Sequence, residues 1–256
     1  MNNSQEQTNV PENDKSAMQV SLKNIKQRTL KPLDAWWTVI VVDPPVTLIV
    51  YIILKIRIPI TPNQVTFMSL VAGGASAYFF CLGQWWHGAW LYQLSFFLDC
   101  IDGRIARFKG MSSHLGAWWD AFVNYLVYGL CVAGLAMSDP NNLWLLGGCL
   151  LLLVIRVCAG FINELLERPV SGTWSHFVAP KDSLLTRFRL LPPGSFPDKH
   201  ALLFFLAPVA GFVVFGVLVN VFLEVVLLLA KIKKLIPQLR LSDENDKGPH
   251  NCNIEE

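Results

Sequence analysis

Two short segments place carboxylates inside otherwise apolar stretches of this sequence. Asp99 and Asp102 are three residues apart, and Asp120 and Asn124 are four residues apart. Both spacings put the two side chains of a pair on one face of a helix. Ionisable residues inside apolar segments are costly and usually functional. These two pairs are therefore the first candidates for chemistry.

The chemistry that these side chains favour is the binding of divalent cations. Three carboxylates close together repel one another unless cations neutralise them. Ligands that offer only oxygen favour magnesium, manganese or calcium over zinc. Gly103 and Ala106 remove bulk from one helical face, and Arg107 adds a cation suited to phosphate at the rim. The pattern predicts a metal site at which a phosphate-bearing ligand can approach the backbone.

The segments that must position these residues are long and apolar. Of the 256 residues, 53% are hydrophobic and 16% are charged, whereas soluble domains carry about 25% charged residues. The sequence predicts an all-α, polytopic membrane bundle with six spans. The first four lie at about 62–82, 85–108, 112–137 and 142–166, and the last two form a hairpin from about 196 to 230 that turns near 208–211. Spans 85–108 and 112–137 are expected to be antiparallel neighbours, which brings the two pairs together.

A shorter apolar segment precedes the first span. Residues 34–60 contain the pair Trp36–Trp37, a break at Pro44–Pro45 and an apolar stretch that ends at Lys55 and Arg57. Aromatic and basic residues of this kind favour an N-terminal amphipathic helix at the membrane interface, with a full span as the alternative. We expect a disordered cytoplasmic leader at 1–33, a membrane domain at 34–232 and a polar cytoplasmic tail at 233–256.

Lysine and arginine are unevenly distributed between the two sides of this predicted bundle. The proposed outer connections, residues 83–84, 138–141 and 208–211, contain none of the 21 basic residues. The positive-inside rule then places both termini and the aspartate cluster on the cytoplasmic side of a multi-pass membrane protein. The net charge of +2 is too small to indicate binding to nucleic acid. The six cysteines show no metal or redox spacing and are expected to behave as small hydrophobes.

The ordered set of fixed positions resembles the signature of the CDP-alcohol phosphotransferase family. The matching string is Asp99-x2-Asp102-Gly103-x2-Ala106-Arg107-x8-Gly116-x3-Asp120-x3-Asn124, which departs from the family only at its last position, where the family has a fourth aspartate. The upstream string Thr61-Pro62-Asn63-Gln64-Val65-Thr66 is similar to the segment that opens the first span of these enzymes. The resemblance covers about residues 34–232.

The resemblance implies an activity and a set of roles. Members of the family transfer a phosphoryl-alcohol group from a CDP-linked donor to a lipid or polar alcohol acceptor and release CMP, as in phospholipid biosynthesis. It implies two Mg²⁺ or Mn²⁺ ions held by Asp99, Asp102, Asp120 and the residue at position 124. It also implies that the protein forms homodimers and contacts membrane lipids. The residues that it assigns to the nucleotide are Asn63, Thr66, Asp99, Gly103, Ala106 and Arg107.

Asn124 stands where the family has the aspartate regarded as the general base. An amide can offer its oxygen to a metal, but it cannot take a proton at neutral pH. A substitution that stalls the reaction, a natural variant that uses another base, and a protein that binds without catalysing are all compatible with it. His114 is a nearby candidate for a relocated base, although a solvated or interfacial histidine is the competing interpretation.

Arginines outside the signature are candidates for contacts to a phosphate. Arg156 lies well inside the fourth predicted span, where an unpaired guanidinium is costly. It either binds a phosphate or a polar acceptor, or forms a structural ion pair with Glu164 or a motif aspartate. Arg187 and Arg189 either reach the same site or contact the anionic lipid surface, which we favour.

Two other classes of membrane protein fit the sequence less well. An aspartate-rich membrane prenyltransferase would need a second aspartate-rich motif and more spans. A transporter or channel would place its charges near mid-span on broken helices, whereas here the aspartates gather at one end of the spans. A binding protein without activity stays open because of Asn124.

The predicted topology can be tested with single cysteines in a chain whose native cysteines have been replaced. Asp139→Cys in an outer connection and Lys247→Cys in the tail should react with a membrane-impermeant thiol reagent from opposite sides. Labelling of both cysteines from the same side would contradict six spans with cytoplasmic termini.

Overall fold

The computed structural model describes residues 21–111, 113–165, 188–191 and 195–246. Within these residues the chain is helical, and its only β-type pairing is an isolated bridge between Asp34 and Leu190. The prediction of an all-α helical bundle is confirmed.

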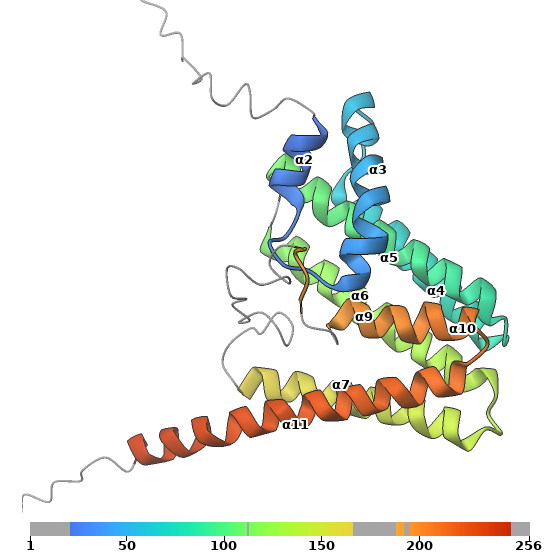
Figure 1. The fold of residues 1–256 in the computed structure, drawn as a ribbon, viewed down its shortest axis with the longest axis vertical. Helices are drawn as coiled ribbons and strands as arrows, with labels where there is room; N and C mark the ends of the chain where they lie inside the picture. Colours follow the sequence, from blue (N-terminus) through green and yellow to red (C-terminus); the bar gives the residue numbers. More distant parts are fainter. Residues whose placement is uncertain (1–20, 112, 166–187, 192–194, 247–256) are drawn as a thin grey trace, which may run out of the picture.

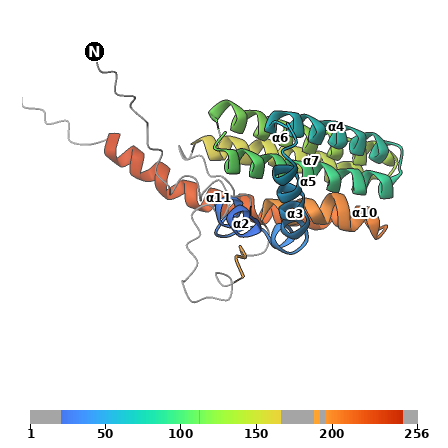
Figure 2. The same ribbon diagram turned by 90° about the horizontal axis from the view of Figure 1, so that it is seen from above.

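The predicted spans appear as long helices that run side by side (Figures 1 and 2). They are α4 (Pro62–Cys81), α5 (Trp85–Lys109), α6 (His114–Ser138), α7 (Leu143–Leu165) and α11 (Val213–Asp246). The fifth span consists of α9 (Phe196–Ala201), the π-helical turn η2 (Leu202–Leu206) and α10 (Ala207–Val209). The expected hairpin follows, and Gly211 turns it with a φ of +77° that side chains rarely adopt.

Local sequence signals begin and end the helices that carry the site. Thr61 caps α4, because its hydroxyl accepts from the Gln64 amide while the Gln64 side chain accepts from the Thr61 amide. The hydroxyl of Ser113 accepts from the Gly116 amide and caps α6. Gly110, at φ +66°, ends α5 in the left-handed conformation. The motif glycine at 116 therefore lies at a helix start.

Helix α4 packs extensively against both α5 and α6, whereas α5 and α6 contact each other little. Small residues allow this close approach: a Cβ on Gly134 of α6 would lie 2.4 Å from the Ala77 carbonyl oxygen of α4. Ser69 of α4 and Ser95 of α5 hydrogen-bond each other's backbone carbonyls at 2.9 and 2.8 Å. The predicted neighbours 85–108 and 112–137 meet through side chains, since Asn124 of α6 donates to Asp99 of α5, but their backbones have little direct contact. Both instead pack on α4, and a space is left between them.

Two N-terminal helices lie crosswise to the bundle. α2 (Leu22–Thr29) and α3 (Asp43–Ile56), which follows the π-helical turn η1 (Thr38–Val42), run across the direction of α7, α9 and α11 in Figure 1, and α3 is seen end-on in Figure 2. A helix crosswise to membrane spans lies along the membrane surface. This arrangement favours the interfacial assignment of residues 34–60.

Length and composition alone select a different set of spans. Five helices of the described part are long and apolar enough to cross a membrane: Thr38–Ile56, Pro62–Cys81, His114–Ser138, Leu143–Ile162 and Val213–Pro237. α5 is missing from this set because its C-terminal half carries the charged motif, and the fifth predicted span because it is divided into short pieces. The protein is thus a multi-pass membrane protein, and the count of six stays a prediction.

The two ends of the chain contain more helix than the polar sequence indicates. α2 lies inside the predicted leader at 1–33, and its Ile25 and Thr29 are buried. α11 continues to Asp246, well into the predicted tail at 233–256, and its Leu235 is also buried. Apolar contacts at these positions extend helical order beyond the hydropathy boundary. Residues 1–20 and 247–256 of the leader and tail lie outside the described residues.

An ion-pair network joins the surface helices to the bundle. The Arg104 guanidinium of α5 pairs with the Asp43 carboxylate of α3 and donates to the Thr47 hydroxyl at 2.5 Å. Arg189 pairs with the other Asp43 oxygen at 3.2 Å and donates to the Lys31 carbonyl at 2.7 Å. Arg189 therefore contacts protein rather than the lipid surface that we favoured. Arg187 lies outside the described residues.

Loss of the carboxylate at position 43 should destabilise this fold. Asp43→Asn leaves the buried Arg104 without a charged partner, so we expect the free energy of unfolding to fall by about 3–5 kcal/mol. Chemical unfolding in detergent measures this change. Asp139→Asn is the matched control, because Asp139 has no ion-pair partner among the described residues and should change stability by less than about 0.5 kcal/mol. Equal stability of the two variants would contradict the role of this network.

Candidate active site

The three motif aspartates gather in the space between α5 and α6. One oxygen from each of Asp99, Asp102 and Asp120 lies within 4.8 Å of the other two. Asp99 and Asp102 come from successive turns of α5 and Asp120 from the first turns of α6, as the helical spacing predicts. Asp102 is nearly buried, with 4% of its surface exposed, and the other two are half-buried.

Neutral hydrogen-bond donors, rather than cations, contact these carboxylates. The Asn124 amide donates to Asp99 at 2.8 Å and to Asp120 at 3.1 Å, so it joins α5 to α6. The Thr66 hydroxyl of α4 lies 2.5 Å from Asp102 and 3.1 Å from the Pro62 carbonyl. None of the three aspartates forms an ion pair within the described residues.

The donor set fits a hard divalent cation. Carboxylate oxygens from three residues converge without a cationic side chain to neutralise them, and like charges in this arrangement repel strongly. Oxygen-rich sites of this kind suit Mg²⁺ or Mn²⁺. Asp99, Asp102 and Asp120 could hold such an ion. The amide oxygen of Asn124 becomes available to it once the amide releases the two carboxylates.

A cavity of about 210 Å³ opens beside the aspartates. Asp99, Gly103, Asp120 and Asn124 line one part of it, and residues of the surface segments and of α9 close the rest. Arg107 also lines it and donates from Nε to the Thr29 carbonyl of α2 at 3.1 Å. The guanidinium thus lies at the rim, as predicted for a group that meets phosphate.

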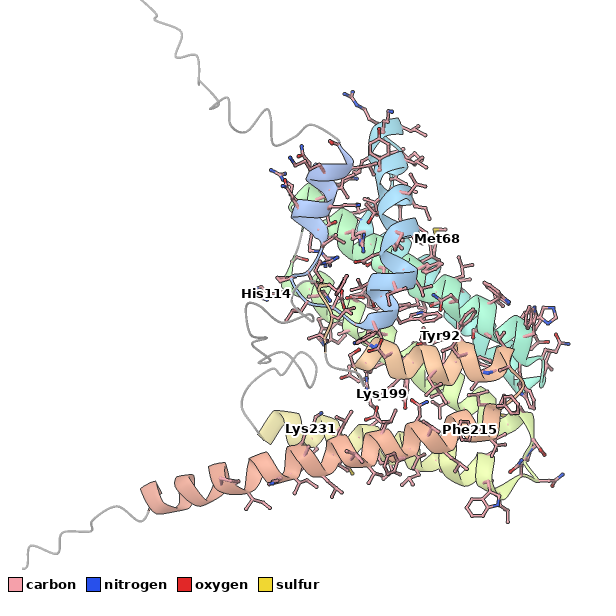
Figure 3. All side chains as sticks on the ribbon, in the orientation of Figure 1. Met68, Tyr92, His114, Lys199, Phe215 and Lys231 are labelled. Atoms are coloured by element: carbon pink, nitrogen blue, oxygen red, sulfur yellow. The ribbon has the colours of Figure 1, made fainter. Side chains whose placement is uncertain are left out.

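Several predicted or candidate residues do not line this cavity. Asp102 belongs to the aspartate cluster and Thr66 contacts it, but neither is part of the lining, and Arg156 is not part of it either. Asn63 is exposed at the start of α4, and Ala106 is half-buried on α5. His114 is the exposed first residue of α6, and Figure 3 shows it apart from Tyr92 and Lys199. The nucleotide-binding roles of Asn63 and Ala106 stay predictions. The position of His114 does not favour it as a relocated base.

Arg156 lies next to the cavity in a cage of aromatic rings. Its guanidinium carbon is 4.7 Å from the ring centre of Tyr125, 5.1 Å from that of Tyr128 and 4.1 Å from that of Phe196. Its Nε is buried without a hydrogen-bond partner in the described part of the chain. No motif aspartate pairs with it there, and the side chain of Glu164 lies outside the described residues.

Sequence reasoning missed four cavity residues that come from distant segments. Asp43 and Arg104 line the cavity together, and Tyr92 and His200 line it from α5 and α9. Arg104 carried a usable signal, since a buried arginine in a span needs a partner. Tyr92 and His200 are 108 residues apart, so no local spacing indicates that they meet.

The fold and the site define a helical membrane protein with an acidic, metal-binding type of centre at one end of the bundle. Residues 59–176 match the family profile described as CDP-alcohol phosphatidyltransferase. This region of the chain is therefore similar to the CDP-alcohol phosphatidyltransferase family, and the resemblance read from the motif is confirmed.

Relatives whose names state an activity match part of this chain. Phosphatidylinositol phosphate synthase of Cutibacterium acnes is 30% identical over 99 residues, which are 37% of this chain and 48% of that protein. A bifunctional IPC transferase and DIPP synthase of Thermococcus kodakarensis is 37% identical over 83 residues, 32% of this chain and 19% of that protein. The matched region thus spans about half, or less, of the length of these relatives.

Solved structures share the fold over a longer range. Mycobacterium tuberculosis phosphatidylinositol phosphate synthase with CDP-DAG bound matches with a TM-score of 0.54 at 20% identity, over 74% of this chain and 92% of that one. The same enzyme in complex with manganese and citrate gives a TM-score of 0.55 at 20% identity, over 74% and 88%.

Metal and donor binding should depend together on the aspartates of α5. Asp99→Ala or Asp102→Ala removes an oxygen from the cluster, so we expect loss of divalent-cation binding and of metal-dependent binding of a CDP-linked donor. Calorimetry with Mn²⁺, and then with the donor at saturating Mn²⁺, measures both. Asp139→Ala, a carboxylate outside the cluster, should leave both affinities unchanged. Metal-dependent donor binding of unchanged affinity in Asp99→Ala or Asp102→Ala would refute this assignment.

Proposed function

We propose that this protein catalyses the metal-dependent transfer of a phosphoryl-alcohol group from a CDP-linked donor to an alcohol acceptor, with release of CMP. The observation that carries the proposal is the convergence of Asp99, Asp102 and Asp120 beside a cavity that Arg107 and Gly103 also line. The family match and the CDP-DAG bound to the Mycobacterium tuberculosis enzyme support a CDP-linked donor. The whole reaction belongs to phospholipid biosynthesis.

Each part of the site has a role in this proposal. Asp99, Asp102 and Asp120 would hold Mg²⁺ or Mn²⁺, which neutralise developing charge on the diphosphate and orient an in-line displacement. Manganese in the Mycobacterium tuberculosis enzyme supports this choice. Thr66 fixes the carboxylate of Asp102 through its hydroxyl. The signature adds Asn63 and Ala106 to the nucleotide-binding residues.

In this proposal the diphosphate of the donor lies near Gly103 and Arg107. A Cβ on Gly103 would lie 3.5 Å from the Arg107 guanidinium, so the guanidinium lies directly beside this glycine. Arg107 presents a planar donor that matches phosphate oxygens. A ligand phosphate at this position is held between the guanidinium and the metal-binding carboxylates.

The acceptor is expected on the side of Arg156. The aromatic cage holds the guanidinium without neutralising its charge, and its unpartnered Nε is available to an oxygen ligand. A phosphate or another polar group on the acceptor would supply that oxygen. Relatives that are named as synthases of inositol phosphate lipids support a polar acceptor of this kind.

Asn124 makes the present chain a slow enzyme in this proposal. Its amide cannot take the proton of the acceptor hydroxyl. The alternative, a homologue that binds CDP-alcohol or lipid without catalysis, is favoured by the two hydrogen bonds from Asn124 to Asp99 and Asp120. These bonds reduce the repulsion between the carboxylates without a metal. Turnover by the native chain distinguishes the two functions.

We also propose on which side of the membrane the site lies and how its substrates reach it. The membrane domain at 34–232 would act with both termini and the cavity on the cytoplasmic side, as the distribution of basic residues indicates. The acceptor and the donor would reach the cavity from the membrane surface along which α2 and α3 lie. A homodimer would agree with the oligomeric state that the family resemblance implies.

A carboxylate at position 124 should raise the rate more than it tightens binding. Asn124→Asp supplies a general base, which acts in the transition state and typically contributes about 10²–10⁴-fold. A carboxylate also attracts a second metal more strongly than an amide does. Single-turnover CMP release and donor affinity, at saturating Mg²⁺ or Mn²⁺, measure the two effects.

Asn124→Gln is the control for this experiment, because it keeps an amide and should not gain rate. Equal rates for the native chain and Asn124→Asp would show that position 124 does not take the proton. The absence of CMP release from both chains, with each candidate acceptor, would refute the proposed function.

A further inference from the structure

One histidine lies inside the cavity that Asn124 also lines. His200 of α9 is 7% exposed and lines the cavity together with Asp99 and Asp120. The preceding residue, Lys199, points from α9 toward α11, where it pairs with Glu224 at 2.6 Å (Figure 3). Adjacent positions on a helix face different directions. The charge of Lys199 is therefore directed away from the cavity, and the imidazole of His200 is directed toward it.

The imidazole is held in one orientation by rings on three sides. It stacks on Tyr128 with ring centres 4.8 Å apart and planes inclined by 19°. The Phe196 ring lies 3.8 Å away, and the Phe204 ring meets it edge-on at 5.7 Å. Its Nδ1 is 2.8 Å from the Tyr92 hydroxyl. One nitrogen is thus fixed, as in histidines that transfer protons.

The other nitrogen of His200 lacks a hydrogen-bond partner in the described part of the chain. Nε2 is buried without a hydrogen bond to any atom of the described residues. A buried polar atom left unpaired costs free energy, and buried side-chain nitrogens are normally satisfied. A histidine that served only to fill the space between Tyr128 and Phe196 could be replaced by an apolar residue without this cost. The free nitrogen therefore indicates a ligand that binds there.

We infer that His200 is the general base of the native chain, which takes the proton of the acceptor hydroxyl in place of the missing carboxylate at position 124. This inference rests on the proposed function. When Tyr92 accepts a hydrogen bond from Nδ1, the lone pair of Nε2 is free to receive a proton.

The proton balance of the step is simple. The O–H bond of the acceptor breaks and its proton goes to Nε2 of His200, while the acceptor oxygen forms a bond to the donor phosphorus. The bond from that phosphorus to the CMP oxygen breaks, and CMP leaves with the electron pair. His200 later returns the proton to water or to CMP. No oxidant, reductant or further reactant is needed.

The other charged and titratable groups around the ring have different roles. Tyr92 of α5 binds Nδ1, and Tyr128 of α6 stacks on the ring. Arg156 of α7 lies across the Phe196 ring at 4.1 Å, where the acceptor is expected. Among the described residues around this part of the cavity, His200 combines a place in the lining with a buried ring nitrogen that has no hydrogen-bond partner.

The experiment compares the same substitution in two chains. His200→Asn keeps a polar atom where Nδ1 meets Tyr92 and removes Nε2. In the native chain it should lower the single-turnover rate of CMP release by about tenfold or more, because the base is lost. In the Asn124→Asp chain a carboxylate takes the proton, so the rate should change by less than about threefold. His114→Gln, outside the cavity, is the matched histidine control in both chains.

Each outcome decides the inference. An equal loss of rate in both chains would show that His200 supports the fold or substrate binding, and would overturn it. An unchanged rate of the native chain would overturn it too. If only Asn124→Asp turns over, the proposed function stands and His200 is not a base. If neither chain turns over while both bind donor and metal, the proposed function fails, and the inference with it.

Discussion

Repulsion among three carboxylates is the constraint on which the rest of this structure depends. Asp99, Asp102 and Asp120 present oxygens within 4.8 Å of one another inside a helical bundle, where charges interact more strongly than in water. α5 and α6 have little backbone contact with each other at this cluster, and both pack on α4. The small residues of α4 and α6 give the bundle its close packing elsewhere. The cavity thus opens where the acidic cluster lies.

The amide at position 124 changes how the cluster meets this constraint. A fourth carboxylate would add to the repulsion, and only bound cations could offset it. Asn124 instead donates to Asp99 and Asp120, so two of the three aspartates are satisfied by a neutral group. A metal must compete with these hydrogen bonds. The amide therefore makes the cluster less dependent on a metal. In the proposed reaction it also replaces the carboxylate that would take the proton, so another proton-accepting group in the cavity becomes important.

Local patterns predicted the elements of this protein, and distant contacts decided how they meet. Hydropathy and turn signals located α4 to α7 and the hairpin near Gly211, because these features are written in consecutive residues. The helical spacing of Asp99 and Asp102 placed them on one face. No local pattern could show that α5 and α6 would both pack mainly on α4. Asp43 and Arg104 are 61 residues apart, so their pairing depends on the crosswise direction of α3, which hydropathy does not encode.

That pairing also connects the site to α3. Arg104 follows Asp102 and Gly103 directly on α5, and its partners Asp43 and Thr47 lie on the crosswise helix α3. The backbone turn that presents the Asp102 carboxylate is therefore held by α3. A buried ion pair that loses one partner leaves an uncompensated charge, which is strongly destabilising. The position of this turn, and with it the proposed contact to a CDP-linked donor, thus depends on a carboxylate 61 residues away in the chain.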